Sequence, residues 1–406
     1  MKVLLITHIF PPAIDGGSKV IYKFGEYLKK QKHEILVLTS NCTSTDDFVN
    51  KKSRPSVIAI PPILRLPVYN FLRRPLKFIN LFLPNNSYLS DLLKVFQKGP
   101  VFKIFPFLKS IFFIIKFQPD LMVTGPLPTT SVIYTNFIKN ILRLTQKKSC
   151  QILINASFHQ TDIDFFKKPL INCLKKADYI WSLTDYEKKY FINNFKIPAN
   201  KIFAIGNGVD DKFIIKNPKI NYPDSPSLLF IGSFSAHKGL EILIKSFSKL
   251  SKKFPKLTLT LAGQETLFFS KIKNTINKLD PEIIKKIYLI NNFKNKDLKK
   301  IIDQSTILVL PSLQESFGLV LIEAMARGKP VITSDIPPLK ELITKTNGGI
   351  IFKTGSEKDL TSQICDLLNH QAKSRQLGLN GFEFVKNHYT WDKIGKTLCQ
   401  NIFFQQ

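Results

Sequence analysis

Short apolar runs alternate with longer amphipathic stretches along most of this chain. The first half holds five apolar runs that we predict to be strands, at 2–7, 34–38, 121–124, 151–155 and 179–182. Stretches with helical spacing of apolar residues lie between them, at 19–30 and 165–177. Apolar runs without polar alternation are typical of parallel strands that are buried on both faces. Their alternation with helices predicts a parallel sheet with crossover helices.

The second half repeats this pattern from Leu228 to Phe352 and then continues into helices. A chain of 406 residues is long enough for two domains, each with its own core. We therefore predict an α/β protein of two doubly wound domains that divides near Ile205.

The segment from Ser312 to Asp335, together with the apolar run just before it, combines a strand, a loop, a helix and a second strand. An apolar run at 307–311 ends in a proline, 317–326 has the composition of a helix, and 331–333 is the next strand. Gly328 supplies the residue that can end the helix in the left-handed region. The loop of such a unit lies at the carboxyl edge of the sheet, where α/β proteins bind ligands and the first helical N–H groups favour an anion.

Two glutamates, Glu315 and Glu323, stand eight positions apart in this segment. A carboxylate accepts hydrogen bonds, and a nucleotide sugar is rich in hydroxyl donors. The alternative interpretation is that both are solvated helix residues, because charged side chains are mostly exposed. At the start of the chain, Gly16 and Gly17 follow the first strand, so their backbone can approach a phosphate or an acceptor closely.

The net charge of +29 is unevenly distributed. Residues 51–150 carry sixteen Lys and Arg against two acidic residues. Within that stretch, 64–84 and 101–117 interleave aromatic residues with cations, and the first of these segments includes Arg65, Arg73, Arg74 and Lys77. Such segments suit the surface of an anionic membrane or, alternatively, a pair of core-packing helices with a basic outer face. Nucleic-acid binding has only the charge in its favour, since no nucleic-acid-binding motif occurs.

The cysteines and the lengths of the apolar runs give further information on the cellular location of the protein. The five cysteines lack paired spacing, which indicates reduced thiols in a cytoplasmic protein and no metal site. The first apolar run is too short for a signal peptide, and no run reaches the length of a spanning helix, so we expect a chain that does not cross a membrane.

Several segments together resemble glycosyltransferase family 4, a group of retaining enzymes with the GT-B fold. The mark of the family is Glu, seven residues, Glu in a setting like that of Glu315 and Glu323. Further similar segments are 8–20, 32–40, 205–213, 230–247 and 347–355. The resemblance implies two Rossmann-like domains facing an interdomain cleft. Residues 1–205 would bind the acceptor and 206–387 the nucleotide-sugar donor, and a last helix at about 388–406 would complete the first domain.

The resemblance also implies roles for individual residues. Glu315 would contact the sugar ring and Glu323 the ribose, and His159 would lie beside the reacting sugar. Lys238 and the N–H groups of the loop before the helix would hold the phosphates; these loop residues are Phe317, Gly318 and Leu319. Two positions depart from the family pattern: Ser233 stands where arginine is usual, and Pro337 with Pro338 stands where two glycines are common.

The function implied is the retaining transfer of a hexose from a nucleotide-diphospho-sugar to a hydroxyl of a glycan or lipid-linked acceptor. The reaction would occur on the front face of the sugar, without a cofactor and without a metal ion. We expect a role in making cell-envelope glycan, a cytoplasmic location with peripheral contact at the inner face of the cell membrane, and no nucleic-acid partner. A catalytically weak sugar-nucleotide-binding protein and a glycoside hydrolase with two carboxylates remain as alternatives.

Overall fold

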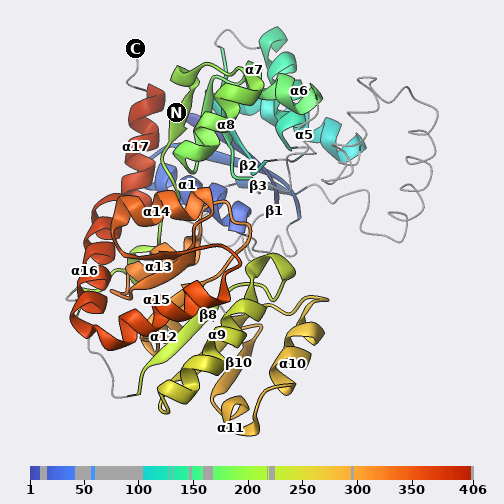
Figure 1. Cartoon of the computed structure of the whole chain (residues 1–406). Coiled ribbons are helices and arrows are strands. Elements are labelled where there is room, and N and C mark those ends of the chain that lie inside the picture. The colour runs from blue at the N-terminus through green and yellow to red at the C-terminus, as the bar shows by residue number, and fades with distance from the viewer. Residues whose placement is uncertain are drawn as a thin grey trace. The chain divides into compact units, whose positions relative to one another are not determined.

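The computed structural model describes most of the chain as two compact units. It describes residues 1–9, 16–41, 56–59, 104–127, 129, 131–145, 149–158, 168–216, 218, 225–293 and 297–403. Unit 1 comprises 1–206 with 395–406, and unit 2 comprises 207–394. Figure 1 shows that each unit is a sheet flanked by helices.

The sheet of unit 1 has seven strands in the order β3-β2-β1-β4-β5-β6-β7, all parallel. The strands are β1 (Lys2–Ile9), β2 (Glu34–Asn41), β3 (Ser56–Ala59), β4 (Leu121–Thr124), β5 (Gln151–Asn155), β6 (Tyr179–Ser182) and β7 (Ile202–Ala204). The direction of winding reverses between β1 and β4, which defines a doubly wound sheet.

Helices connect these strands. They are α1 (Gly16–Lys30), α5 (Ile104–Phe117), α6 (Ser131–Thr145), α7 (Lys168–Lys176) and α8 (Asp185–Phe195), with a 3-10 turn at Ala199–Lys201. The last helix, α17 (Trp391–Phe403), contributes its residues from Gly395 onward to unit 1. There the Tyr179 hydroxyl donates to the Ile402 carbonyl at 3.0 Å, which fastens the end of α17 to β6.

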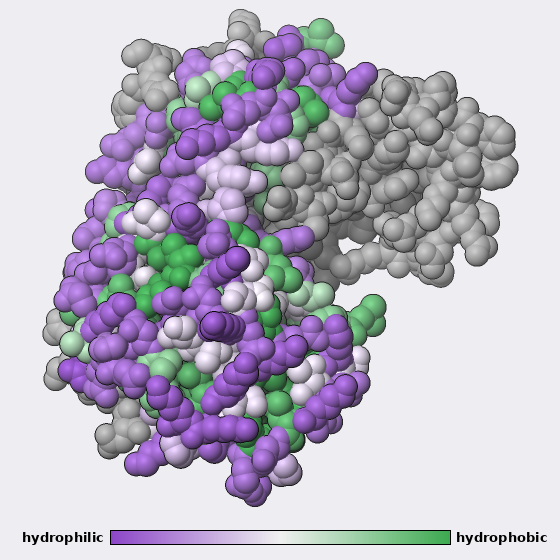
Figure 2. Space-filling view, viewed as in Figure 1, coloured by the Kyte–Doolittle hydropathy of each residue, from purple (hydrophilic) through white to green (hydrophobic). Residues whose placement is uncertain are grey.

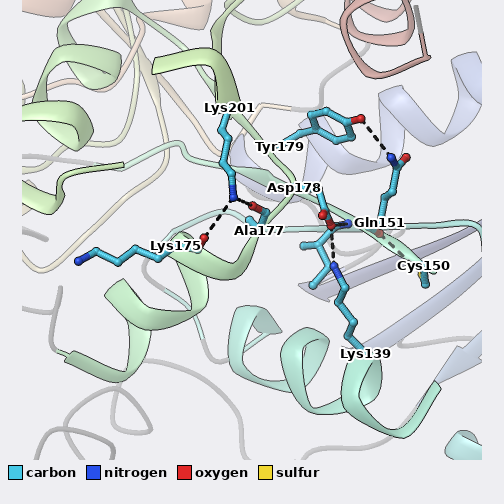
Figure 3. A network of polar contacts seen from close by, with 9 residues as sticks. Lys139, Cys150, Gln151, Lys175, Ala177, Asp178, Tyr179 and Lys201 are labelled. Carbon is cyan, nitrogen blue, oxygen red and sulfur yellow. Dashed lines mark hydrogen bonds and ion pairs between the residues drawn. The ribbon is translucent and has the colours of Figure 1, made fainter. Parts of the chain in front are cut away.

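A polar network anchors the amino edge of this sheet (Figure 3). Asp178, just before β6, accepts hydrogen bonds from Lys139 Nζ at 2.6 Å and from the Ile152 N–H at 2.7 Å. Gln151 donates to the Tyr179 hydroxyl at 3.1 Å, and Lys201 donates to the Ala177 carbonyl at 3.0 Å. Lys139 is buried on α6, so its charge is compensated rather than solvated. The network joins helix, strands and loops at the edge opposite the carboxyl ends of the strands, which indicates a structural role.

The sheet of unit 2 has six parallel strands in the order β10-β9-β8-β11-β12-β13. They are β8 (Ser227–Ile231), β9 (Thr258–Gly263), β10 (Ile287–Asn291), β11 (Ile307–Leu310), β12 (Val331–Ser334) and β13 (Gly349–Phe352). Every residue of β11 and β12 is buried, as expected for central strands covered on both faces. The winding reverses between β8 and β11.

The described residues of unit 2 also form eight helices and two 3-10 turns. The helices are α9 (Leu240–Lys253), α10 (Phe269–Asn277), α11 (Pro281–Ile284), α12 (Leu298–Asp303), α13 (Leu319–Met325), α14 (Pro337–Thr346), α15 (Glu357–Asn369) and α16 (Gln371–His388), and the 3-10 turns are Asp211–Phe213 and Ala236–Lys238. The outward surfaces of the helices seen in Figure 2 are mostly hydrophilic, with small hydrophobic patches between them. Among the described residues, no helix is both long enough and apolar enough to span a bilayer.

The predicted α/β architecture of two doubly wound parallel sheets is therefore present. Several details differ from the sequence prediction. The strands β3 and β7 and the helix α8 were not predicted. In addition, α1 begins at Gly16 rather than at 19, and α13 begins at Leu319 rather than at 317. The last difference has a local cause: Gly318 adopts a φ of 82°, which no α-helix contains.

Candidate functional site

Two loops at the carboxyl edge of the unit 2 sheet bring a lysine and a glutamate together. The loop after β8 carries Lys238, and the loop after β11 carries Glu315. β8 and β11 are neighbours at the point where the winding reverses, so their carboxyl-end loops meet. Lys238 Nζ lies 2.5 Å from Glu315 Oε2, and the side chains are only 13% and 12% exposed. This is the position at which doubly wound sheets bind ligands.

Close backbone packing fixes the two loops against each other. The Leu313 N–H donates to the His237 carbonyl at 2.7 Å. A Cβ on Gly239 would lie 2.1 Å from the Pro311 carbonyl oxygen, and Gly239 has a φ of 66°. Both the conformation and the contact therefore require glycine. Gly239 also leads directly into α9, so this contact sets where the first turn of that helix begins.

A pocket of about 420 Å³ lies at the carboxyl ends of β8, β9 and β10, the same edge of the sheet from which the loop with Lys238 leaves β8. Its lining residues are Ile231, Gly232, Ser233, Gly263, Gln264, Asn292 and Phe293. Gly263 is required there, because a Cβ on it would lie 1.7 Å from the Gly232 carbonyl oxygen. The lining combines bare backbone, two amide side chains, a hydroxyl and an aromatic residue. Such a lining can hold a flat, polar ligand group through hydrogen bonds and stacking.

A chain of polar side chains runs from the pocket toward Lys238. Ser233, which lines the pocket, has its Oγ 3.0 Å from Ser235 Oγ. Ser235 Oγ lies in turn 3.4 Å from His237 Nε2. Sequence analysis identified Ser233 as a departure from the family pattern but gave no role to Ser235 or His237. The signal was present in the alternating polar positions 233, 235 and 237, although only the folded loop shows that they contact one another.

The residues that follow Glu315 are placed by the start of α13. Phe317 is buried and its ring packs against Tyr389 at a centroid distance of 5.7 Å. Gly318 precedes the helix, and its carbonyl accepts from the Leu321 N–H at 2.9 Å. Glu323 lies within α13 and is 6% exposed. The low exposure of Glu323 contradicts the interpretation of that residue as a solvated helix position.

The loop between β12 and α14 offers fewer free backbone N–H groups than the family pattern of two glycines would. Pro337 and Pro338 occupy the first turn of α14, where proline removes N–H groups that would otherwise be available to an anion. Asp335 accepts from the Thr354 N–H at 2.9 Å and from the Thr354 hydroxyl at 2.5 Å. These hydrogen bonds lower the pKa of the Asp335 carboxyl below its ordinary value. The loop is thus tied to the end of β13, and its backbone offers fewer donors than two glycines would.

Other predicted site residues cannot be related to this geometry. His159 and the basic residues Arg65, Arg73, Arg74 and Lys77 lie outside the described residues. Gly16 and Gly17 form the start of α1 in unit 1. Within the described part of the chain, no group of three or more His, Cys, Asp or Glu side chains is placed to hold a metal ion.

The residues around the ion pair and the pocket fall within a segment that matches a known family model. Residues 211–384 match the model described as "Glycosyl transferases group 1". This segment, which is less than half of the chain, is similar to a glycosyl transferases group 1 domain. It contains both loops, the pocket and α13, so the geometry described above belongs to the part of the chain that the family model covers.

Curated relatives extend the similarity at low identity. An uncharacterized glycosyltransferase of Methanocaldococcus jannaschii is 29% identical over 229 residues, which is 56% of this chain and 59% of the relative. A second one from the same organism is 21% identical over 98% of this chain and 96% of its own length. The O-antigen chain mannosyltransferase RfbU of Salmonella typhimurium is 28% identical over 49% of this chain and 54% of its own length. The first and third matches thus span little more than half of those relatives.

Solved structures show the same fold over the whole chain. Sucrose-phosphate synthase from Thermosynechococcus elongatus has a TM-score of 0.73 at 19% identity, covering 100% of this chain and 98% of that one. Anabaena HepE in complex with UDP and glucose has a TM-score of 0.73 at 15% identity, with 99% of each chain covered. The predicted GT-B fold class is confirmed by these matches.

Proposed function

We propose that this protein is a retaining glycosyltransferase that moves a hexose from a nucleotide-diphospho-sugar to a hydroxyl of a glycan or lipid-linked acceptor. The observation that carries the proposal is the Lys238–Glu315 ion pair, which lies at the winding reversal of the unit 2 sheet, within the segment that matches the glycosyl transferases group 1 model. HepE, a structural neighbour, was determined with UDP-glucose, which supports a nucleotide sugar as the donor class.

In this proposal the base of the donor lies at the side of the pocket formed by Gln264 and Asn292, and the diphosphate passes Ser233 and extends toward Lys238. The pocket offers the Gln264 and Asn292 amides to the base, and the loop after β8 leads from Ser233 to the lysine. Lys238 exchanges its contact with Glu315 for a contact with a phosphate. Without a ligand the two side chains compensate each other, which avoids an unpaired charge in a mostly buried position.

This change of partner places Glu315 beside the transferred sugar and Lys238 beside the diphosphate. Glu315, released from the lysine, can accept a hydrogen bond from a hydroxyl of the transferred sugar. The Lys238 ammonium then faces the negative charge that grows on the leaving diphosphate. A positive charge that is already in place stabilises a transition state in which the bond between the sugar and the diphosphate breaks before the new bond forms. On the front face of the sugar, the acceptor hydroxyl enters where the diphosphate leaves and passes its proton to the departing phosphate. Lys238 supplies the positive charge in this scheme, and no cofactor or metal ion takes part.

Glu323 and the acceptor side of the site complete the proposal. Glu323 would bind the ribose hydroxyls, with the N–H groups of 317–319 directed at phosphate oxygens. The backbone of Gly16 and Gly17 would approach the donor phosphates or the acceptor closely, and His159 would lie beside the reacting sugar. RfbU, a relative named as an O-antigen chain mannosyltransferase, supports a role in cell-envelope glycan synthesis. We further propose that the protein acts at the inner face of the cell membrane.

The test combines donor binding with transfer. Purified protein is heated with a panel of nucleotide sugars, because a ligand at 100 times its Kd adds about 2.7 kcal/mol to the stability of the folded state. We expect one donor to raise the melting temperature, Glu323→Ala to weaken that effect, and Glu315→Ala to abolish transfer. Glu282→Ala is the matched control, since Glu282 is exposed on α11 and pairs only locally with Lys285.

The outcomes distinguish the alternatives. Full transfer by both Glu315→Ala and Glu323→Ala would refute the site assignment. Donor binding without transfer to any glycan or lipid-linked acceptor would favour the catalytically weak binding protein. Release of free sugar with water as the acceptor, and no dependence on a nucleotide, would favour a hydrolase.

A further inference from the structure

We propose that His237, acting through Ser235 and Ser233, replaces the arginine expected at position 233 and makes donor binding stronger at low pH than at high pH. This inference rests on the proposed function, because it assigns the diphosphate of the donor to the loop after β8. His237 acts as a positioning residue in this scheme, since only Ser233 of the three lines the pocket.

The geometry forms a continuous path from the imidazole to the pocket. His237 Nε2 lies 3.4 Å from Ser235 Oγ, and Ser235 Oγ lies 3.0 Å from Ser233 Oγ. All three side chains are partly buried. The backbone of the same loop is fixed by the contact of the Leu313 N–H with the His237 carbonyl at 2.7 Å and by the Gly239 contact with Pro311. The path is therefore held in place by backbone contacts that do not depend on the side chains.

The direction of the hydrogen bonds along this path depends on the proton of the imidazole. A hydroxyl can donate one hydrogen bond and accept others, and an imidazolium can only donate. When Nε2 carries a proton, it donates to Ser235, Ser235 donates to Ser233, and the Ser233 hydrogen points to the pocket. When Nε2 accepts instead, Ser235 donates to it and Ser233 donates to Ser235, which leaves an oxygen lone pair facing the pocket. A phosphate oxygen is favoured in the first state and repelled in the second.

An imidazolium always carries a proton on Nε2, whereas only a neutral imidazole can use Nε2 as an acceptor, so lowering the pH favours the donating state of the path. The charged groups on the neighbouring elements that follow have ion-pair or hydrogen-bond partners. Lys238 contacts Glu315, and Glu241 in the first turn of α9 contacts Lys271 at 3.1 Å. Glu265, in the loop after β9, accepts from Asn291 at 2.7 Å. A proton on His237 thus adds a positive charge near carboxylates that already interact with other side chains.

The experiment measures donor affinity against pH. UDP-glucose, UDP-galactose and GDP-mannose are titrated into the protein by calorimetry at several values from pH 5.5 to 8. Both phosphates of these donors are esterified, so the ligand itself does not change charge in that range. We expect the Kd of the bound donor to rise about tenfold from pH 5.5 to 8, the size expected for losing one hydrogen bond with a charged character.

Three variants separate the path from general effects. Ser235→Ala interrupts the path while keeping the histidine, and we expect its Kd to be nearly independent of pH. His237→Gln should bind as weakly at pH 5.5 as the unchanged protein binds at pH 8. His388→Gln removes an exposed histidine elsewhere in unit 2 and should keep the full pH dependence. Melting temperatures without ligand establish that each variant is folded.

The results separate this inference from the function on which it rests. A donor that binds with the same Kd across the range, or a Ser235→Ala variant that keeps the full dependence, overturns the role of His237 and leaves the proposed function intact. If none of the three donors nor any other nucleotide sugar binds at any pH, the proposed function fails and this inference fails with it.

Discussion

At the scale of single residues, the Lys238–Glu315 pair gives the most direct prediction. Replacing Lys238 with glutamine removes the charge that offsets the leaving diphosphate in the proposed mechanism. We expect kcat to fall by about 10²- to 10³-fold, the loss typical of one electrostatic stabiliser, with a smaller change in KM. Steady-state kinetics of sugar transfer measure both values.

Lys245→Gln provides the control for that change, because Lys245 is exposed on α9 and the substitution alters the net charge equally. Its kcat should match that of the unchanged protein. A Lys238→Gln variant that changed only KM would assign the lysine to donor binding alone and would contradict its role toward the leaving group.

Asp335 gives a prediction about acid stability. Its pKa is lowered in the folded state, chiefly by the hydrogen bonds from Thr354. A carboxyl with a lowered pKa stabilises the fold above its ordinary pKa of about 3.9, and this contribution is lost as the pH falls through the folded value. Thr354→Val removes the side-chain donor. We therefore expect the variant to be less stable at pH 7 and to lose less free energy of unfolding between pH 7 and pH 3.

Urea unfolding at the two pH values measures that difference. Thr361→Val is a suitable control, since the Thr361 hydroxyl donates to the Glu357 carbonyl within α15 and contacts no carboxylate there. Equal losses of stability on acidification in the Thr354 variant and in the unchanged protein would contradict the assignment.

Some of the site could be predicted from the residues alone. Glu315 and Glu323 stand out because they follow a buried strand in a strand-loop-helix unit, where doubly wound sheets bind ligands. Lys238 stands out only through the resemblance of its segment to glycosyltransferase family 4. The contact of Lys238 with Glu315 could not be predicted, because it depends on the course of two loops that meet only in the fold. For the same reason, no role could be predicted for Ser235 and His237. Their proposed roles depend on the conformation of a loop, and loops have no periodic sequence pattern of the kind that predicts strands and helices.

At the scale of elements, the tight contact between the two loops predicts an unusual sensitivity to a single methyl group. Gly239→Ala combines a left-handed φ of 66° with a Cβ that would lie 2.1 Å from the Pro311 carbonyl oxygen. We expect a loss of stability of about 2 to 4 kcal/mol and weaker donor binding, because the loops must separate. Thermal unfolding and donor titration measure the two effects.

Gly355→Ala isolates the cost of backbone conformation in that experiment. Gly355 has a φ of 79°, but a Cβ there would meet no atom within 4 Å. It should lose about 1 to 2 kcal/mol and bind the donor normally. Equal losses of stability and equal donor affinities in the two variants would show that the contact with Pro311 contributes nothing measurable.

The elements were predictable where the local pattern is strong and less so where tertiary contacts decide. β4, β5 and β6 lie at their predicted positions because each is a short apolar run between turn residues. The start of α13 was missed because Gly318 takes a conformation that only the loop packing requires. β3 was missed because its four residues lie inside a long stretch dominated by basic and aromatic residues.

At the scale of the whole molecule, alternation of strands and helices was enough to predict the fold class, since few topologies satisfy the rules of parallel sheets. What the pattern does not identify is the acceptor. The uneven charge points to the basic stretch at 51–150, where sixteen cations face two acids. If this stretch brings the protein to a lipid-linked acceptor, binding to an anionic surface must depend on particular cations and not only on the total charge.

Vesicle binding tests that requirement. Changing Arg73, Arg74 and Lys77 to glutamine removes three positive charges from the basic stretch, and changing Lys252, Lys253 and Lys256 removes three exposed charges from unit 2. At about 1 kcal/mol for each cation near the membrane, the first variant should bind anionic vesicles roughly 100-fold more weakly and with less sensitivity to salt. The second should bind like the unchanged protein. If both variants lose affinity equally, the net charge of +29 alone attracts the vesicles, and the basic stretch has no special role in reaching the acceptor.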